Sequence, residues 1–102
     1  MENPPVPLVT VIIPPPLEKF APALGDVTRW QIVALLAAGE PLLVSEIAAK
    51  LGRDAGLISK HLARLREAGV VTAGRARLYQ IPPMFLQTPG IADFGHCQIP
   101  AK

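Results

Sequence analysis

Cysteine is almost missing from this chain of 102 residues, since Cys97 is the only one. A single thiol forms neither an intrachain disulfide nor a zinc site made of several thiolates, which excludes a small secreted domain held by disulfides. No apolar stretch approaches the roughly 20 residues that a membrane-spanning helix requires. The N-terminus carries Glu2 in place of a basic region, and the short apolar stretch 8–13 ends in three prolines, so no signal peptide is predicted. We therefore expect a soluble, cytoplasmic protein without contact with a membrane.

Charged and aromatic residues are also scarce, at 18% and 5% of the chain. Half of the residues are apolar, however, and at this length that content predicts one folded domain rather than a disordered chain. The sequence shows no paired carboxylates, no glycine-rich phosphate loop and no nucleophile with a histidine base at a recognisable spacing. We therefore expect no enzyme, no catalytic residues and no cofactor.

The net charge of +2 is distributed unevenly along the chain. Residues 1–51 hold three basic and five acidic side chains, a balance of −2, while residues 81–102 hold one of each. Residues 52–80 hold six basic and two acidic side chains, a balance of +4. A basic segment on an otherwise neutral chain is typical of a surface for a polyanion, although a solvated face is the simpler interpretation of any charged stretch.

Prolines gather at both ends of the chain. Six of the twelve lie in residues 1–16, where they prevent a helix and favour an extended arm around the β-branched run 9–13. Four more lie in residues 82–102, which therefore cannot form one long helix. Both segments also contain large apolar side chains, so we expect a proline-rich arm at 1–16 and a tail at 82–102 that packs on the domain or on a dimer partner.

Helical signals fill the segment between these ends. Apolar spacing predicts helices at 17–24, 27–38 and 55–68, and a short helix that Ser45 caps and that runs through Lys50. Asp26 and Asp54 are the predicted N-caps of the helices at 27–38 and 55–68. Pro22 is expected to kink or divide the first helix. The second is apolar on most of its circumference, so it is expected to cross the core, with Trp30 inside. Residues 70–81 are typical of a β-hairpin with a glycine-containing loop, with Arg75 expected at its tip and Arg77 on its return strand.

Two helices joined by a tight turn and followed by a hairpin have the order of a winged helix-turn-helix. Ala48 is the small residue where the helices approach, Gly52 suits the turn, and Ile58 is the inward anchor of the second helix. Such motifs place the second helix in the major groove of DNA and the hairpin on an adjacent backbone or minor groove. The predicted fold is therefore mainly α with a small β-hairpin (α+β), a winged helix-turn-helix over residues 17–81.

Residues 23–81 resemble the ArsR/SmtB-type winged-helix transcriptional regulators. The resemblance rests on the D-x-T-R motif that begins at Asp26, the S-x-H-L motif that begins at Ser59, and the segment L-R-E-A-G-V-V that begins at Leu65. It implies a small dimeric repressor that binds double-stranded DNA. The best-known members bind metals through two cysteines before the turn, but segment 41–46 has no thiol here, so no metal site is predicted.

The resemblance and the count from the helix cap together predict which side chains lie at the DNA. They come from the helix before the turn, the recognition helix and the wing: Ser45, Arg53, Asp54, Ala55, Gly56, Ser59, Lys60, His61, Arg64, Arg75 and Arg77. Because Ala55 and Gly56 lack hydrogen-bonding side chains, we expect binding led by backbone charge and DNA shape, with modest sequence specificity.

Several interpretations stay open at this stage. His61 either contacts a phosphate or packs at the helix edge, and Arg29 is expected to form an ion pair within or between helices. Tyr79 is expected in the core. His96 and Cys97 either belong to an ordinary tail or serve as metal ligands or a redox thiol. The sequence identifies no effector, and a module for protein interaction or low-specificity architectural DNA binding is the alternative function.

Overall fold

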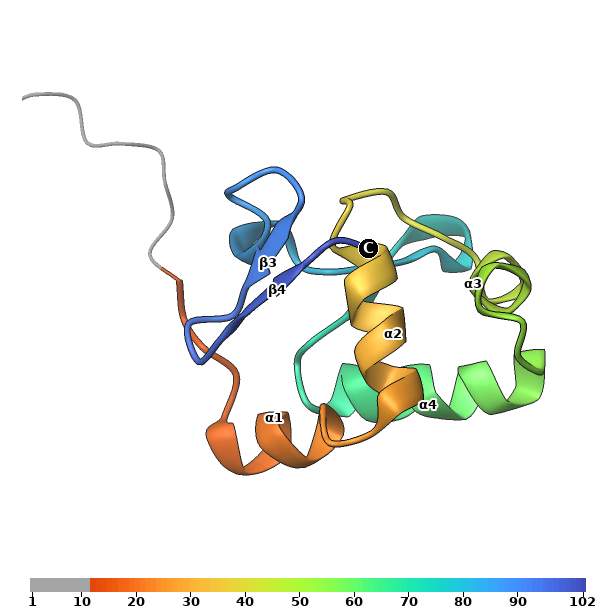
Figure 1. The fold of residues 1–102 in the computed structure, drawn as a ribbon, viewed down its shortest axis with the longest axis horizontal. Coiled ribbons are helices and arrows are strands. Elements are labelled where there is room, and N and C mark those ends of the chain that lie inside the picture. Colours follow the sequence, from red (N-terminus) through yellow and green to blue (C-terminus); the bar gives the residue numbers. More distant parts are fainter. Residues whose placement is uncertain (1–11) are drawn as a thin grey trace, which may run out of the picture.

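In the described part of the chain, four α-helices precede two short antiparallel hairpins (Figure 1). The computed structural model describes residues 12–102. The helices are α1 (Leu17–Ala23), α2 (Val27–Leu36), α3 (Val44–Leu51) and α4 (Ala55–Glu67). The strands are β1 (Thr72–Ala73), β2 (Tyr79–Gln80), β3 (Ile91–Asp93) and β4 (Gln98–Pro100), and the short 3-10 helices are η1 (Arg75–Arg77) and η2 (Pro83–Phe85). The mainly α fold with a wing that the sequence predicts is confirmed.

Carboxylate caps fix the starts of α2 and α4. Asp26 Oδ2 accepts a hydrogen bond from the backbone N–H of Arg29 at 3.0 Å, and Asp54 Oδ2 accepts one from Leu57 at the same distance. Each bond satisfies a backbone donor that has no partner within the helix, which confirms both predicted N-caps. Between these helices, Gly52 ends α3 with a φ of +64°, a left-handed conformation that glycine adopts without steric cost.

The start of α3 differs from the prediction. The helix begins at Val44, and Leu43 occupies the cap position, so Ser45 lies inside the first turn rather than at the cap. Glu46 explains the difference, because its Oε1 accepts a hydrogen bond from the backbone N–H of Leu43 at 2.8 Å. This bond from the backbone N–H of the cap residue to the third residue of the helix is the acidic half of a capping box, and it stabilises a helix start with Leu43 at the cap.

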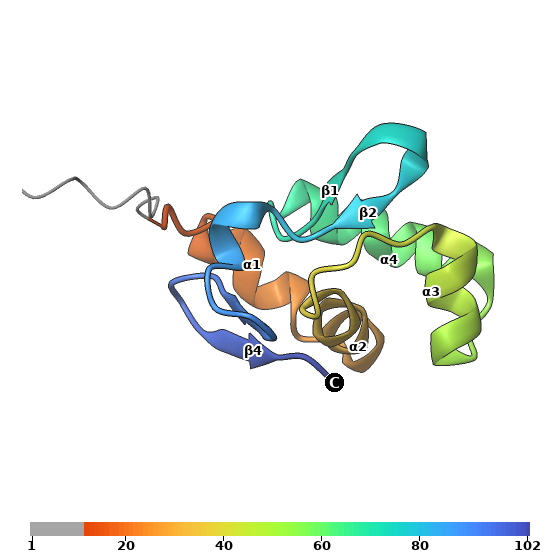
Figure 2. The ribbon, with the colours of Figure 1, turned by 90° about the horizontal axis from the view of Figure 1, so that it is seen from above.

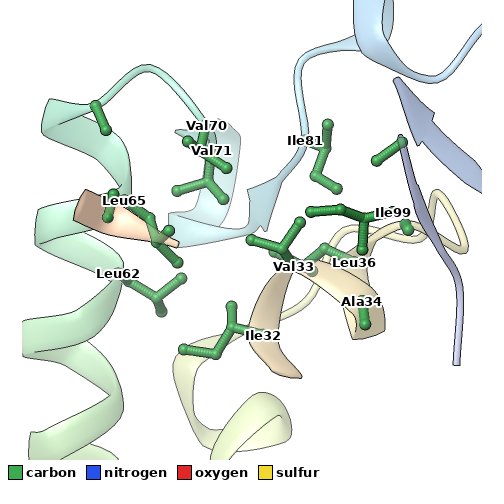
Figure 3. Packing of buried hydrophobic residues seen from close by; sticks show 14 of the residues in the cluster. Ile32, Val33, Ala34, Leu36, Leu62, Leu65, Val70, Val71, Ile81 and Ile99 are labelled. Atoms are coloured by element: carbon green, nitrogen blue, oxygen red, sulfur yellow. The ribbon is translucent and has the colours of Figure 1, made fainter. Parts of the chain in front are cut away.

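Helix α2 crosses the core and contributes several buried side chains to it (Figure 3). Ile32, Val33 and Leu36 are buried, whereas Val27 is 70% exposed and Trp30 is 42% exposed. The prediction that Trp30 belongs to the core is therefore wrong. Val27 and Trp30 lie in the first turn of the helix, and the residue one turn after Trp30 on the same side is buried again, so the exposure is confined to the N-terminal end of α2, where no element of the described chain covers these side chains fully.

The wing is a short antiparallel hairpin in which Thr72 pairs with Gln80 and Ala73 with Tyr79. Residue Leu42 forms a further bridge, since its backbone exchanges two hydrogen bonds with that of Tyr79, at 2.7 and 2.9 Å. Tyr79 is half-buried at this bridge. The bridge ties the segment before α3 to the wing, so the wing has a fixed position relative to the helices.

The wing tip differs from the prediction that Arg77 lies on the return strand. Ala76 and Arg77 adopt left-handed backbone conformations, with φ of 57° and 61°, which prolong the turn, and β2 begins only at Tyr79. Such a conformation costs a residue with a side chain about 1–2 kcal/mol. Backbone strain of this kind gathers at ligand-binding segments.

Residues 82–102 form a second hairpin that shares the core of the helices. Strands β3 and β4 pair through Ala92 and Ile99, both fully buried. The ring of Phe94 is also fully buried. Its centroid lies 5.3 Å from that of the Phe20 ring on α1 and 4.9 Å from that of the Phe85 ring on η2. This segment therefore packs on the helices of its own chain. The prediction of arm, domain and tail boundaries at 16/17 and 81/82 stays a prediction.

The described part of the N-terminal segment lies against the turn between β3 and β4. His96 Nε2 donates a hydrogen bond to the Pro15 carbonyl at 2.7 Å, and a Cβ at Gly95 would lie only 2.7 Å from Pro14 Cγ. Gly95 has a φ of +86°, so glycine suits this close approach on two grounds. Most of the predicted strand at 9–13 lies outside the described residues, apart from the half-buried Ile12 and the exposed Ile13.

Candidate nucleic-acid interface

Helix α4 carries a buried stripe and an exposed polar surface. Ile58, Leu62 and Leu65 are fully buried against the core. All four residues expected to reach the bases are exposed: Ala55, Gly56, Ser59 and Lys60. The sequence therefore forms an amphipathic helix whose apolar side holds it in place while its N-terminal polar side is open to a ligand.

The exposed residues of α4 divide between two sides of the helix. Ser59 and Arg66 are seven positions apart, so they lie one above the other and face the wing. With Val44, Tyr79 and the wing residues they line an open cavity of about 550 Å³; the wing residues are Ala73, Gly74 and Arg77. The cavity joins α4 to the wing tip, although the two are separate in sequence.

The other side of α4 faces α1. Arg64 lines a cavity of about 310 Å³ together with Glu67 of the same helix and Glu18 and Lys19 of α1. Two carboxylates thus share the surroundings of Arg64, whereas the cavity beside the wing is lined by no acidic residue of the described chain. The predicted set of basic residues is therefore divided between two electrostatic environments.

The remaining predicted positions surround the N-terminal end of α4. Ser45 is exposed in the first turn of α3, and Asp54 is exposed with its carboxylate engaged as a cap. Arg53 is exposed in the turn between α3 and α4, and its Nη2 donates to Gln31 Oε1 on α2 at 3.5 Å. Arg75 and Arg77 are exposed at the wing tip. The turn, the start of α4 and the wing together make a polar and basic surface.

His61 lies at the junction of α2 and α4 and not on this open surface. Its side chain is only 15% exposed, its Nδ1 accepts a hydrogen bond from Arg29 Nη1 at 3.2 Å, and its Nε2 lies 4.0 Å from Asp26 Oδ2. These contacts agree with the interpretation of His61 as a residue that packs at the helix edge. A phosphate contact from His61 stays a prediction.

Arg29 binds backbone carbonyls in place of the expected ion pair. Its Nε donates to the Ala23 carbonyl at 2.6 Å and its Nη2 to the Pro22 carbonyl at 3.4 Å. The carbonyls at the end of α1 lack partners within that helix, and a guanidinium group satisfies two of them at once. Arg29 therefore fastens the turn between α1 and α2 to α4 through His61.

Asp26 makes the stability of the fold depend on pH in the acidic range. The backbone N–H of Arg29 lowers the pKa of the Asp26 carboxyl below its ordinary value of 3.8, partial burial opposes that shift, and the charge on Arg29 supports it. A carboxyl group with a lowered pKa in the folded state stabilises the fold at any pH above its unfolded-state pKa. That contribution is lost as the pH falls through the lower, folded-state value.

We therefore expect Asp26→Asn to flatten the fall in stability of the protein below pH about 4. Urea unfolding followed by circular dichroism at a series of pH values measures the slope. Glu40→Gln, in the exposed loop after α2, is the control with the same loss of charge. Equal acid slopes in the wild type and in Asp26→Asn would show that Asp26 does not couple to folding.

His96 and Cys97 lie in the turn between β3 and β4 of the second hairpin. Burial raises the pKa of the Cys97 thiol, and the Asp93 carboxylate acts in the same direction, so the thiol form is favoured over the reactive thiolate. The centroid of the His96 ring lies 5.1 Å from that of the Phe20 ring, and His96 also contacts the Pro15 carbonyl. Within residues 12–102, no three possible metal-ligating side chains of the His, Cys, Asp and Glu types lie together. These contacts make both residues part of the packing between the N-terminal segment and β3–β4.

Sequence reasoning did not select Arg66 as a site residue. The signal was present, because the residue follows Ser59 by seven positions on an amphipathic helix and so lies on the same stripe. What the sequence did not contain is the position of the wing, which makes that stripe one wall of a cavity.

The comparisons with known proteins concern α4 and the segments before it, and they do not reach the wing tip. Residues 26–73 match the family model described as bacterial regulatory protein, arsR family. The match extends from the Asp26 cap through α2, α3 and α4 to the end of β1. No match is found among curated proteins. In the part of the chain that the structure describes, no helix has the length and apolar character to cross a membrane.

Proposed function

We propose that this chain, whose residues 26–73 form an arsR-family regulator domain for DNA binding, is a dimeric repressor of transcription in the cytoplasm. Its α4 lies in the major groove, and its wing lies on the adjacent backbone or minor groove. The observation that carries this proposal is the arrangement of the exposed basic wing tip beside the exposed polar side of a helix whose apolar side is fully buried.

The residues of this surface suggest how DNA is read. Ser59 and Lys60 are the candidates for hydrogen bonds to base edges, while Ala55 and Gly56 allow a close approach of the helix backbone. Phosphates and the narrow minor groove are the proposed partners of the basic and hydroxyl side chains around the helix, namely Ser45, Arg53, Arg64, Arg75 and Arg77. Asp54 holds the helix start through its cap. Binding is led by charge and DNA shape.

Dimerisation is proposed because a two-fold operator requires two copies of the recognition helix. Exposed apolar side chains on the described surface support an interface between two copies of the chain: Val27 is 70% exposed, Trp30 is 42% exposed and Ile13 is 69% exposed. We propose that the segment 9–13 takes part in this interface.

The binding of a labelled duplex, measured by fluorescence anisotropy over a series of salt concentrations, tests the function. We expect the affinity to fall steeply and linearly on logarithmic axes as salt rises, because phosphate counterions are released on binding. Sedimentation of the complex is expected to give two protein chains per duplex. Salt-independent binding or no binding would contradict the DNA-binding function, and a monomer on and off DNA would contradict the dimer.

The alternative of an architectural protein with low specificity is favoured by one observation. The first two positions of α4, Ala55 and Gly56, offer no hydrogen-bonding side chain to a base edge. Equal affinity for random and selected duplexes in the same assay would support this alternative. A selected operator with a preference of at least about tenfold, or about 1.4 kcal/mol, would support the repressor.

A further inference from the structure

We propose that one DNA backbone phosphate is bound between two arginines, Arg66 of α4 and Arg77 of the wing tip, with Ser59 beside it. This inference rests on the proposed function and adds to it a specific phosphate site and a residue, Arg66, outside the expected set. Three features of the structure carry it: the cavity, its charge and the strained wing tip.

The cavity has the shape and chemistry of a site for a sugar-phosphate backbone. It is open, measures about 550 Å³, and lies between α4, the first turn of α3 and the wing. One part of its wall is apolar, formed by Val44 and the half-buried Tyr79, and suits a deoxyribose ring. Another part carries the Ser59 hydroxyl and the two guanidinium groups, which are donors to phosphate oxygens.

The charge of the cavity is not balanced within the protein. Arg66 and Arg77 both line it, and none of the described residues that line it is acidic. Within residues 12–102, neither guanidinium group has an ion pair with a carboxylate. Two like charges at one cavity repel each other unless an anion lies between them, and a phosphate accepts from arginine through two parallel hydrogen bonds.

Arg64 gives the contrast on the same helix. It shares its cavity with Glu18 and Glu67, so its charge is already opposed by carboxylates of the protein. A phosphate near Arg64 therefore meets a weaker field than one near Arg66. Of the two arginines in the C-terminal half of α4, Arg66 is therefore expected to attract a phosphate more strongly than Arg64.

The backbone of the wing tip supports the same site. Arg77 and its neighbour Ala76 hold left-handed conformations, with φ of 61° and 57°. This turn places Arg77 at the cavity rather than on the return strand. Strained residues of this kind gather where a ligand is clamped.

A charge-matched comparison tests the role of Arg66. In the anisotropy assay, Arg66→Ala is expected to weaken duplex binding by roughly tenfold at low salt and to make the salt slope shallower by about 1. Lys102→Ala removes the same charge at the end of the chain opposite the wing (Figure 2) and is expected to change binding less than about threefold, because it lies outside the cavity that Arg66 and Arg77 line. Arg66→Lys is expected to recover only part of the affinity, because lysine lacks the fork geometry.

A scan with methylphosphonates tests whether both arginines hold the same phosphate. Each phosphate of the most tightly bound duplex is replaced in turn by a neutral methylphosphonate. At one position, the methylphosphonate is expected to weaken binding of the wild type but not of Arg66→Ala. The same position is expected to have no effect on binding of Arg77→Ala. Thermal unfolding of both variants, at exposed positions, is expected to match the wild type.

The outcomes separate this inference from the function on which it rests. If the wild type binds DNA with a steep salt dependence but Arg66→Ala behaves like Lys102→Ala, the phosphate site is wrong and the proposed function stands. Different positions for the two arginines in the scan would also overturn the shared site. If the wild type does not bind duplex DNA at all, both proposals are wrong.

Discussion

The double variant Arg75→Ala/Arg77→Ala is expected to bind every duplex more weakly, by about 10- to 100-fold at low salt. Both side chains are exposed at the wing tip, and neither faces a carboxylate within the described chain. In the proposed complex they contact the backbone or the minor groove, which carry little sequence information, so selected and random duplexes are expected to lose affinity alike. The salt slope is expected to become shallower by about 2, one for each lost phosphate contact.

Lys60→Ala is the matched comparison for this prediction. The residue lies on the exposed side of α4 near its start, and in the proposed complex its ammonium group donates to a guanine edge in the major groove. Its loss is expected to reduce the preference for the selected operator by about 1–3 kcal/mol, with a smaller effect on random duplexes. If the double wing variant binds normally, or if it loses preference rather than overall affinity, the assignment of the wing to the backbone is wrong.

Phe94→Ala is expected to reduce the free energy of unfolding by about 3–5 kcal/mol, the usual cost of truncating a fully buried phenylalanine. The Phe94 ring has no exposed surface and contacts the rings of Phe20 and Phe85, which come from opposite ends of the chain. The cavity left by this change lies where α1, η2 and the β3–β4 hairpin meet. The midpoint of thermal unfolding is expected to fall by more than about 10 °C.

Two variants control this prediction. Leu17→Ala removes apolar atoms from a side chain that is 54% exposed and is not part of the proposed dimer interface, so its effect is expected to stay below about 1 kcal/mol. Phe94→Leu keeps most of the volume and is expected to cost less than Phe94→Ala. A loss below about 1 kcal/mol for Phe94→Ala would show that residues 82–102 add little to the stability of the domain.

The local signals in the sequence determined the helical part of this protein. A carboxylate before an apolar run satisfies backbone donors within three residues, so Asp26 and Asp54 mark the starts of α2 and α4 without any contact from elsewhere. The same holds for the buried stripe of α4 and for the order of helices, turn and hairpin. These features depend on neighbours along the chain, and the family resemblance depended on the same segment.

Other features were decided by contacts between distant parts of the chain. The way in which the helices pack on one another determined that Trp30 faces solvent and that Arg29 binds the carbonyls of Ala23 and Pro22. Proline-rich residues 82–102 were expected to pack somewhere, but the hairpin of β3 and β4 forms because Phe94 and Ile99 find a core surface on α1 and α2. A single sequence does not state which apolar surfaces meet.

The candidate phosphate site shows the same division. The sequence determined that Arg66 is on the stripe of Ser59 and that the wing carries Arg77. Only the tertiary structure, through the bridge of Leu42 to Tyr79 and the left-handed turn at the wing tip, brought the two arginines to one cavity. Helical spacing is a property of the backbone of one segment, whereas the distance between two segments depends on everything that packs between them.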